Sequence, residues 1–190
     1  MFARTERLLL RPGWLEDAPA LARIASDEAV ARNLTRLPSP YGMADAEAFL
    51  ASQAEQSCPP LLIFRRTHGA PQLIGCIGLE PNASGEHELG YWIARKYWGL
   101  GYATEAGRAI VDMAREALRL QRIEAGHFLD NPGSGRVLRK LGFRPTGEVV
   151  MNRSLARAGE VPTLLYTLDL AGREELQCDE ALEEACQMAA

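Results

Sequence analysis

The sequence has few of the residues that would indicate a metal site or a disulfide framework. Of its 190 residues only four are cysteine and three are histidine. No two cysteines form a Cys-x-x-Cys pair, and no histidine lies at metal-ligand spacing from them. We therefore expect reduced thiols in a reducing compartment and no bound metal.

Long apolar runs and an excess of basic residues are also absent. No stretch approaches the roughly 20 apolar residues that cross a bilayer. The three leucines at 8–10 are too few for the apolar region of a signal peptide. Lys and Arg total 21 against 25 Asp and Glu, a formal charge of −4 that does not favour nucleic acid or anionic lipid. The sequence predicts a cytoplasmic protein with neither a membrane nor a nucleic acid as partner.

Apolar residues are plentiful at 47%, and the length suits one domain with a well-filled core. We place that domain at residues 1–172. Residues 173–190 are acidic and rich in alanine, which is typical of a C-terminal tail or a short helix. This tail contains Cys178 and Cys186 and could pack against a partner chain, so a homodimer stays an open alternative.

The apolar pattern and its breakers predict a mixed α/β (α+β) chain. Strands are expected at 8–10 (ending before Pro12), 61–64, 73–79, 88–93, 123–129, 148–151 and 164–170. Helices are expected from a cap at Asp17 to Ser26, over 44–56, over 103–118, and from a cap at Asn131 to Leu141–Gly142. Turns fall at 68–69 and 82–85. The order runs from helices through antiparallel strands to alternating strands and helices.

The most informative segment is 93–104, which joins a predicted strand to a predicted helix. Gly99 and Gly101 let the backbone turn sharply and approach a ligand closely. The free amides and the positive dipole end of the following helix make an anion site, and Arg95 and Lys96 add positive charge. The segment predicts a bound phosphate or pyrophosphate.

Two alternatives stay open for the role of this glycine loop. A nucleotide P-loop would end in Gly-Lys-Ser/Thr, whereas this chain has Gly101-Tyr102-Ala103. A dinucleotide fingerprint needs a third glycine at the position of Thr104. It also needs an acidic residue about 20 positions further on that binds the ribose, and Glu124 matches that spacing only approximately. A nucleotide-binding α/β protein is one alternative, and a tight turn without any ligand is the second.

Three segments together resemble a known family. Residues 96–101 resemble the Gln/Arg-x-x-Gly-x-Gly/Ala signature of the GNAT acetyltransferases, with Lys96 where the family prefers Gln or Arg. Residues 97–106 are similar to the branch that contains the ribosomal-protein N-terminal alanine and serine acetyltransferases. Residues 131–143 resemble the second motif of that branch, and 5–12 resemble its opening. The loop acts mainly through main-chain amides, so the departure at Lys96 changes little.

The resemblance implies the GNAT fold, a mostly antiparallel sheet with a splayed parallel strand pair flanked by helices. It implies that acetyl-CoA lies between the splayed strands. Its pantetheine arm would pair with the backbone around Ile93, and its diphosphate would bind the loop amides. For Asn131 a plain helix cap, and for Arg136 and Lys140 a solvated helix face, are the alternatives. The residues implied in cofactor binding are Ile93, Lys96, Trp98, Gly99, Gly101, Tyr102, Ala103, Thr104, Asn131 and Arg136.

The resemblance further implies an N-acetyltransferase in which a primary amine, on a protein N-terminus or a small molecule, attacks the thioester directly. Ser134 matches the serine that assists the leaving thiolate, and a backbone amide of the first splayed strand would stabilise the oxyanion. A base must deprotonate the amine, and Glu88 is the first candidate. Alternation places Glu86 and Glu88 on one face and His87 on the other, while a solvated strand start is the alternative. A non-catalytic acyl-CoA-binding sensor on the same fold is the second functional hypothesis.

Overall fold

The computed structural model of the chain describes residues 2–53, 56, 58–82 and 85–171. The predicted tail at 173–190, with both its cysteines, lies outside the described residues. So do positions 54–55 of the helix predicted over 44–56 and positions 83–84 of the turn predicted at 82–85.

The described strands form one eight-stranded sheet in the order β1-β2-β3-β4-β5-β6-β8-β7. Every neighbouring pair is antiparallel except β5 and β6. This arrangement confirms the predicted mixed, mostly antiparallel sheet with one parallel pair. The strands are β1 Ala3–Arg4, β2 Leu8–Pro12, β3 Leu61–Arg65, β4 Gln72–Pro81, β5 His87–Ile93, β6 Arg122–Phe128, β7 Arg144–Ser154 and β8 Gly159–Asp169.

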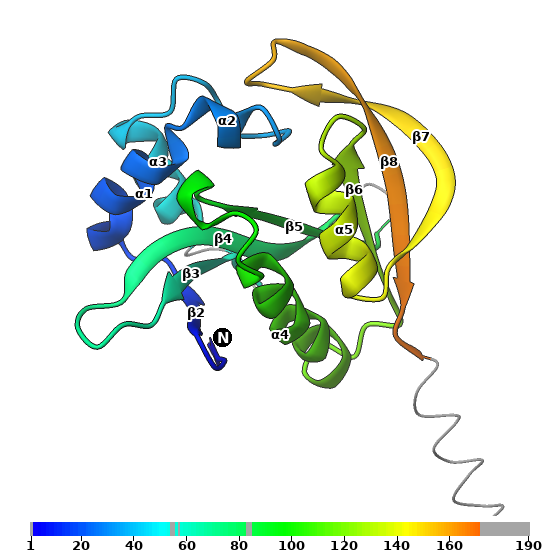
Figure 1. The fold of residues 1–190 in the computed structure, drawn as a ribbon, viewed down its shortest axis with the longest axis horizontal. Helices are drawn as coiled ribbons and strands as arrows, with labels where there is room; N and C mark the ends of the chain where they lie inside the picture. The colour runs from blue at the N-terminus through cyan, green and yellow to red at the C-terminus, as the bar shows by residue number, and fades with distance from the viewer. Residues whose placement is uncertain (1, 54–55, 57, 83–84, 172–190) are drawn as a thin grey trace, which may run out of the picture.

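The parallel pair opens like a V (Figure 1). β5 and β6 pair only at His87 with Ile123 and at Glu88 with Glu124, although β5 continues to Ile93. From Leu89 onward the edge of β5 that faces β6 therefore has no strand beside it. Such a gap in the middle of a sheet exposes backbone N–H and C=O groups to a ligand.

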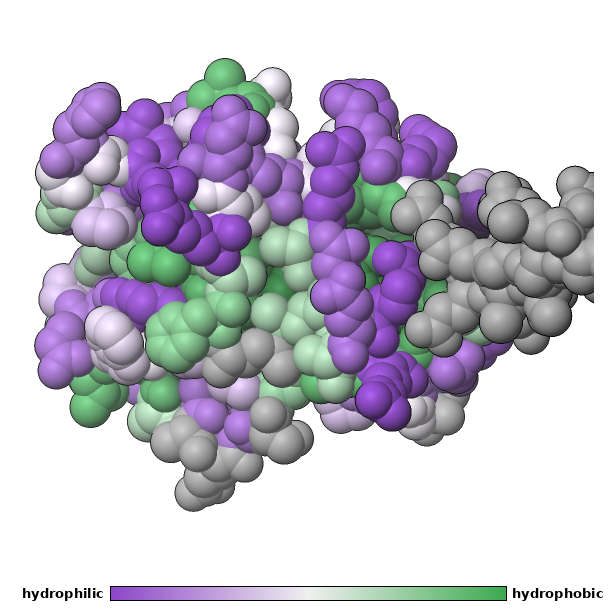
Figure 2. All heavy atoms as spheres, turned by 90° about the horizontal axis from the view of Figure 1, so that it is seen from below, coloured by the Kyte–Doolittle hydropathy of each residue, from purple (hydrophilic) through white to green (hydrophobic). Residues whose placement is uncertain are grey.

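Helices cover both faces of the sheet (Figure 1). β3 shows why its sequence is a continuous apolar run. Leu61 and Ile63 belong to the core beneath α4 and α5, whereas Leu62 and Phe64 belong to the core beneath α1 and α3. The helices are α1 Ala18–Ala25, α2 Glu28–Ala31, α3 Met43–Ser52, α4 Tyr102–Glu116 and α5 Pro132–Lys140. On the face seen in Figure 2, hydrophilic side chains surround a band of apolar ones.

Several element boundaries differ from the sequence prediction. β2 continues through Pro12, which pairs with Leu61 of β3. β1 does not extend as far as Pro12, so the missing N–H of proline costs no hydrogen bond to β1. α3 ends at Ser52 rather than at 56, and α2 and β1 were not predicted. β7 and β8 are each 11 residues long, far longer than expected. β7 is an edge strand with mostly exposed residues, so it lacks the apolar alternation on which strand prediction depends.

Asp17 occupies the predicted N-cap position of α1, but its side chain accepts no hydrogen bond from that helix. Its carboxylate accepts hydrogen bonds from both terminal nitrogens of Arg11, at 2.7 and 2.8 Å, and from the backbone amide of Trp14 at 2.9 Å. The predicted cap at Asn131 is confirmed, because its side chain accepts from the amide of Ser134 at the start of α5. Gly142, at φ 93°, ends that helix as predicted.

Candidate active site

The glycine loop has the backbone geometry that its sequence predicts. After a short 3-10 turn at Arg95–Tyr97, Gly99 has φ 75° and Gly101 has φ 82°, and α4 begins at Tyr102. L-residues with side chains rarely adopt these φ values, so glycine is required at both positions. The first amides of α4 lack intrahelical acceptors and point from the positive end of the helix dipole. The loop is thus built as an anion site.

The opening segment of the chain holds this loop in place. Arg7 donates to the carbonyl of Leu100 at 3.0 Å and to Glu105, in the first turn of α4, at 2.7 Å. Thr5 donates to the same carboxylate at 2.5 Å, and the Arg7 guanidinium lies 4.5 Å from the centre of the Tyr102 ring. Partial burial alone would raise the pKa of Glu105, but the hydrogen bonds from Thr5 and Arg7 lower it below its usual value. Residues 5–12 matched the family opening, but the sequence did not reveal that this segment holds the glycine loop.

The open edge of β5 presents alternate backbone groups. The amide of Ala94 donates to Ile74 of β4 at 2.7 Å, whereas the carbonyl of Ile93 accepts from the Trp98 indole at 2.6 Å. N–H and C=O groups alternate sides along an antiparallel strand. Leu89, Tyr91 and Ile93 therefore direct their backbone groups away from β4, into the gap between β5 and β6.

A single cavity of about 800 Å³ brings most of the predicted site residues together. It runs along β5 from the glycine loop to the segment after α2, with α5 on one side. Lys96 is not among its lining residues, and the Lys96 ammonium lies 4.8 Å from the centre of the Tyr97 ring. The predicted residues that line the cavity are Glu88, Ile93, Trp98, Gly99, Gly101, Tyr102, Ala103, Thr104, Asn131, Ser134 and Arg136.

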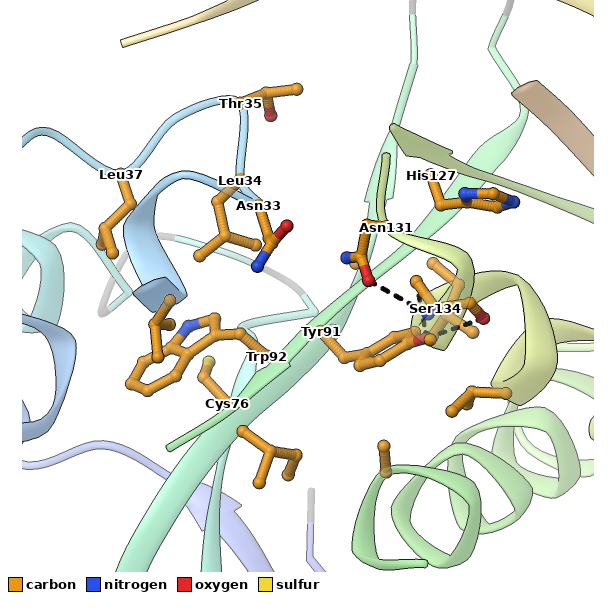
Figure 3. A pocket seen from close by; sticks show the side chains of 18 of the residues that line it. Asn33, Leu34, Thr35, Leu37, Cys76, Tyr91, Trp92, His127, Asn131 and Ser134 are labelled. Atoms are coloured by element: carbon orange, nitrogen blue, oxygen red, sulfur yellow. Dashed lines mark hydrogen bonds between the residues drawn. The ribbon is translucent and has the colours of Figure 1, made fainter. Parts of the chain in front are cut away.

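Ser134 has a partner that the sequence did not reveal. Its hydroxyl lies 2.7 Å from the phenol of Tyr91, and its amide donates to the Asn131 side chain at 3.3 Å (Figure 3). Burial raises the pKa of Tyr91 to about 12, although the hydrogen bond with Ser134 lowers it. Tyr91 therefore stays a neutral phenol that can donate to, or accept from, the serine.

Of the three candidates for the base, Glu88 alone lines the cavity. Glu86 lies 3.4 Å from Arg122. Removal of water by the cavity walls raises the pKa of Glu88, Glu80 and Glu124 raise it further, and Arg36 lowers it. A carboxylate with a raised pKa is a better proton acceptor from an ammonium group.

His127 also lines the cavity, but its ring is held by protein partners. Nδ1 lies 2.8 Å from the carbonyl of Phe128 and Nε2 lies 3.4 Å from the Tyr166 hydroxyl. A Cβ atom at Gly135 would lie 2.6 Å from His127 Nε2. Glycine at 135 therefore lets α5 pack closely on β6.

The loop that follows α2 lines the far end of the cavity, and the hairpin of β7 and β8 holds this loop. This hairpin reaches toward α2 (Figure 1). Ser154 donates its hydroxyl to Leu34 O at 2.9 Å and Leu155 donates its amide to Thr35 O at 2.9 Å. Arg157 donates to Arg32 O at 2.6 Å and pairs with Asp130 at 2.8 Å. Segments from both halves of the chain therefore fix the loop that follows α2.

Comparison with known proteins identifies the class. Residues 7–144 match the model of the acetyltransferase (GNAT) domain, so the chain belongs to the GNAT family. It is 32% identical over 152 residues to the uncharacterised N-acetyltransferase p20 of Bacillus licheniformis, covering 75% of this chain and 82% of that protein. It is 33% identical over 150 residues to the uncharacterised N-acetyltransferase YoaA of Bacillus subtilis, with the same coverage of 75% and 82%. The chain is thus an acetyl-CoA-dependent acetyltransferase.

Solved structures agree on the fold. A GNAT acetyltransferase from Bacillus anthracis matches with a TM-score of 0.77 at 24% identity, over 90% of this chain and 99% of that one. RimL, a ribosomal L7/L12 acetyltransferase solved with coenzyme A, matches with a TM-score of 0.76 at 16% identity, over 90% and 99% of the two chains. The predicted family is confirmed, and the neighbours include members of the ribosomal-protein branch.

Two features are absent from the described part of the chain. No helix there is long and apolar enough to cross a bilayer. No group of three or more His, Cys, Asp or Glu side chains among the same residues is placed to hold a metal ion.

Proposed function

We propose that this enzyme transfers the acetyl group of acetyl-CoA to the neutral form of a primary amine by direct attack. The observation that carries the proposal is the continuity of one cavity from the glycine loop, along the open edge of β5, to Glu88 and Ser134. Each part corresponds to one requirement of the reaction. An anion site holds the diphosphate, a strand edge holds the arm, and the reacting groups follow.

The residues present fit coenzyme A. The amides that follow Gly101 suit a diphosphate, because both glycines have a positive φ and a Cβ atom at Gly99 would meet nothing within 4 Å. The backbone groups of Tyr91 and Ile93 suit the amide-rich arm, and the indole of Trp98 already shows that Ile93 O accepts hydrogen bonds. Arg136 and Lys140 line the same cavity from α5 and suit the phosphate of the adenosine end.

The reaction needs a proton removed from the amine and a proton returned to sulfur. Glu88 is the proposed base, which takes a proton from the ammonium form so that the nitrogen lone pair can attack the acetyl carbon. The C–N bond forms and the C–S bond breaks, while backbone amides on the open edge of β5 stabilise the oxygen anion. In this proposal Ser134 gives its proton to the leaving thiolate and regains one from the attacking nitrogen, which loses its second proton as the amide forms. The Tyr91 phenol, 2.7 Å from the serine hydroxyl, hydrogen-bonds to the serine oxygen during this exchange.

The acceptor in this proposal is a primary amine, on a protein N-terminus or a small molecule. RimL supports the first class, since it acts on ribosomal protein L7/L12. MccE supports the second, because this microcin C7 self-immunity acetyltransferase was solved with acetyl-CoA and AMP. At 16% and 15% identity to this chain, neither decides between the two classes.

The test is incubation with acetyl-CoA and a panel of amines, with free thiol and acetylated product measured together. The proposal expects one acetylated amine for each thiol released. Tight binding of coenzyme A without product from any amine would instead support the non-catalytic sensor. Displacement of coenzyme A by ATP or NAD would support a nucleotide-binding protein.

A further inference from the structure

The cavity also covers the face of β5 that carries Glu88 and Trp92, and we call the region over this face the acceptor chamber. Apolar and aromatic side chains from the segment after α2, from α3, and from β4 and β5 line most of it, and Asn33 and Thr35 add polar groups on the same side of β5 (Figure 3). Figure 3 shows Leu34, Leu37, Cys76 and Trp92 together on one side of β5, while Tyr91, Asn131, Ser134 and His127 lie on the other. The chamber residues are Leu34, Leu37, Tyr41, Phe49, Cys76 and Trp92.

One strand face connects the chamber to the proposed base. Glu88, Gly90 and Trp92 lie at alternate positions of β5 and so face the same side. A Cβ atom built on Gly90 meets nothing within 4 Å, so the surface between the carboxylate and the indole is open space. A ligand lying over Gly90 would contact Glu88 at one end and Trp92 at the other.

Charge separates the chamber from the cofactor end of the cavity. The cationic residues among the described lining are Arg36, Arg136 and Lys140. Arg36 forms an ion pair with Glu80, and the other two lie on α5, across β5 from the chamber. Within the described lining, the chamber therefore has no unpaired cation for a carboxylate or phosphate, while Glu88 favours an ammonium group.

The chamber is also preformed. The bonds from Ser154 and Leu155 to the carbonyls of Leu34 and Thr35 hold the loop that supplies Leu34 and Leu37. Tyr41 and Cys76 are 8% and 6% exposed, which places them in the core that supports the chamber walls. A peptide backbone in such a space would bury amide groups against apolar walls, at a cost in free energy.

We propose that the acceptor is a small amine with an uncharged, apolar body, which lies over Gly90 against Trp92 with its amino group toward Glu88. This inference rests on the proposed acetyl transfer and selects one of its two acceptor classes. It excludes amines that carry a carboxylate, and it excludes a protein N-terminus as the preferred acceptor.

The test compares kcat/KM, by thiol release, for four probes: phenethylamine, phenylalanine, ethanolamine and a short peptide that begins with alanine. The kcat/KM for phenethylamine is expected to exceed that for each of the others by about tenfold or more. Phenylalanine adds a carboxylate, ethanolamine lacks the ring, and the peptide adds a polar backbone. A higher kcat/KM for the peptide or for phenylalanine would overturn the chamber inference and leave acetyl transfer intact. No thiol from any probe, with coenzyme A still bound, would overturn both.

Three variants locate the effect in the chamber. Gly90→Val fills the open space with a residue that suits a strand, and it should lower kcat/KM for phenethylamine by about 100-fold without changing coenzyme A binding. Trp92→Ala should lower the ratio of phenethylamine to ethanolamine activity, whereas Trp14→Ala, at an aromatic that is 53% exposed outside the cavity, should not. An unchanged kcat/KM for phenethylamine in Gly90→Val, together with an unchanged probe ratio in Trp92→Ala, would overturn the inference.

Glu80→Gln tests the charge argument by gain of activity. Without its partner, Arg36 can pair with a substrate carboxylate, so the activity on phenylalanine should rise relative to phenethylamine. A fall in that ratio would contradict the assigned role of the Arg36–Glu80 pair.

Discussion

The hydroxyl of Ser134 lies 2.7 Å from the phenol of Tyr91, so a residue on the open strand directly orients a residue on the opposite helix. The contact crosses the gap between β5 and α5, where the proposed thioester would lie (Figure 3). It links the strand that presents backbone groups with the helix that presents the candidate acid.

Removal of this pair should lower turnover in a coupled way. Ser134→Ala is expected to lower kcat by about 100-fold, as for loss of a general acid. Tyr91→Phe should lower kcat by about tenfold, because one hydrogen bond to the serine is lost. In a double-mutant cycle the combined variant should be no slower than Ser134→Ala alone, since Tyr91 acts through the serine. Fully additive losses would assign Tyr91 an independent role.

The pH profile should report Glu88. A base must be deprotonated to work, and desolvation raises the pKa of Glu88, so the acid limb of kcat/KM should lie above the usual carboxyl range. Glu88→Gln should lower kcat by about 100-fold and remove that limb. An unchanged rate at saturating amine would exclude Glu88 from the mechanism and favour a water chain. Glu86→Gln, at the carboxylate beside Arg122, is the matched control.

The support of the glycine loop should depend on pH through Glu105. Its pKa is lowered in the folded protein, so its stabilising contribution is present above the ordinary carboxyl pKa and is lost as pH falls through the lowered value. Glu105→Gln should decrease the free energy of unfolding by about 1–2 kcal/mol at neutral pH and by less in acid. Urea unfolding at the two pH values measures this, and an equal loss at both would contradict it. The Arg7 side chain is 43% exposed, so most of the effect should come from the hydrogen bonds rather than from charge alone.

The hairpin turn should influence the acceptor and not the cofactor. Arg157→Ala removes the bonds to Arg32 O and Asp130 and so loosens the loop after α2. KM for the amine is expected to rise by about tenfold, because that loop positions the chamber walls. The dissociation constant of coenzyme A should stay unchanged, as it should for both ligands in Arg144→Ala at the other end of β7. A change in coenzyme A affinity alone would contradict the assignment.

The sequence predicted local features where one residue type was physically required. Gly99, Gly101 and Asn131 are examples, since a positive φ or a helix cap selects their type directly. The family resemblance supplied the gap between β5 and β6, because it depends on which strands pair and no local pattern encodes that. Contacts between distant segments were not predictable, such as Thr5 with Glu105 or Ser154 with Leu34. The N-cap position of Asp17 was predicted, but its side chain pairs with Arg11 instead of the helix amides, and no local pattern encodes that choice.

The most direct test of the central claim is titration calorimetry of coenzyme A on a matched pair of glycine variants. Gly99→Ala and Gly147→Ala each place a side chain at a positive φ, 75° and 85°, with nothing within 4 Å of the added Cβ. Their strain should therefore be similar, at about 1–2 kcal/mol each. Only Gly99 lies in the proposed diphosphate site, so Gly99→Ala should weaken coenzyme A binding at least tenfold beyond any effect of Gly147→Ala. Equal affinities in the two variants, or no heat of binding in the unaltered protein, would contradict the account.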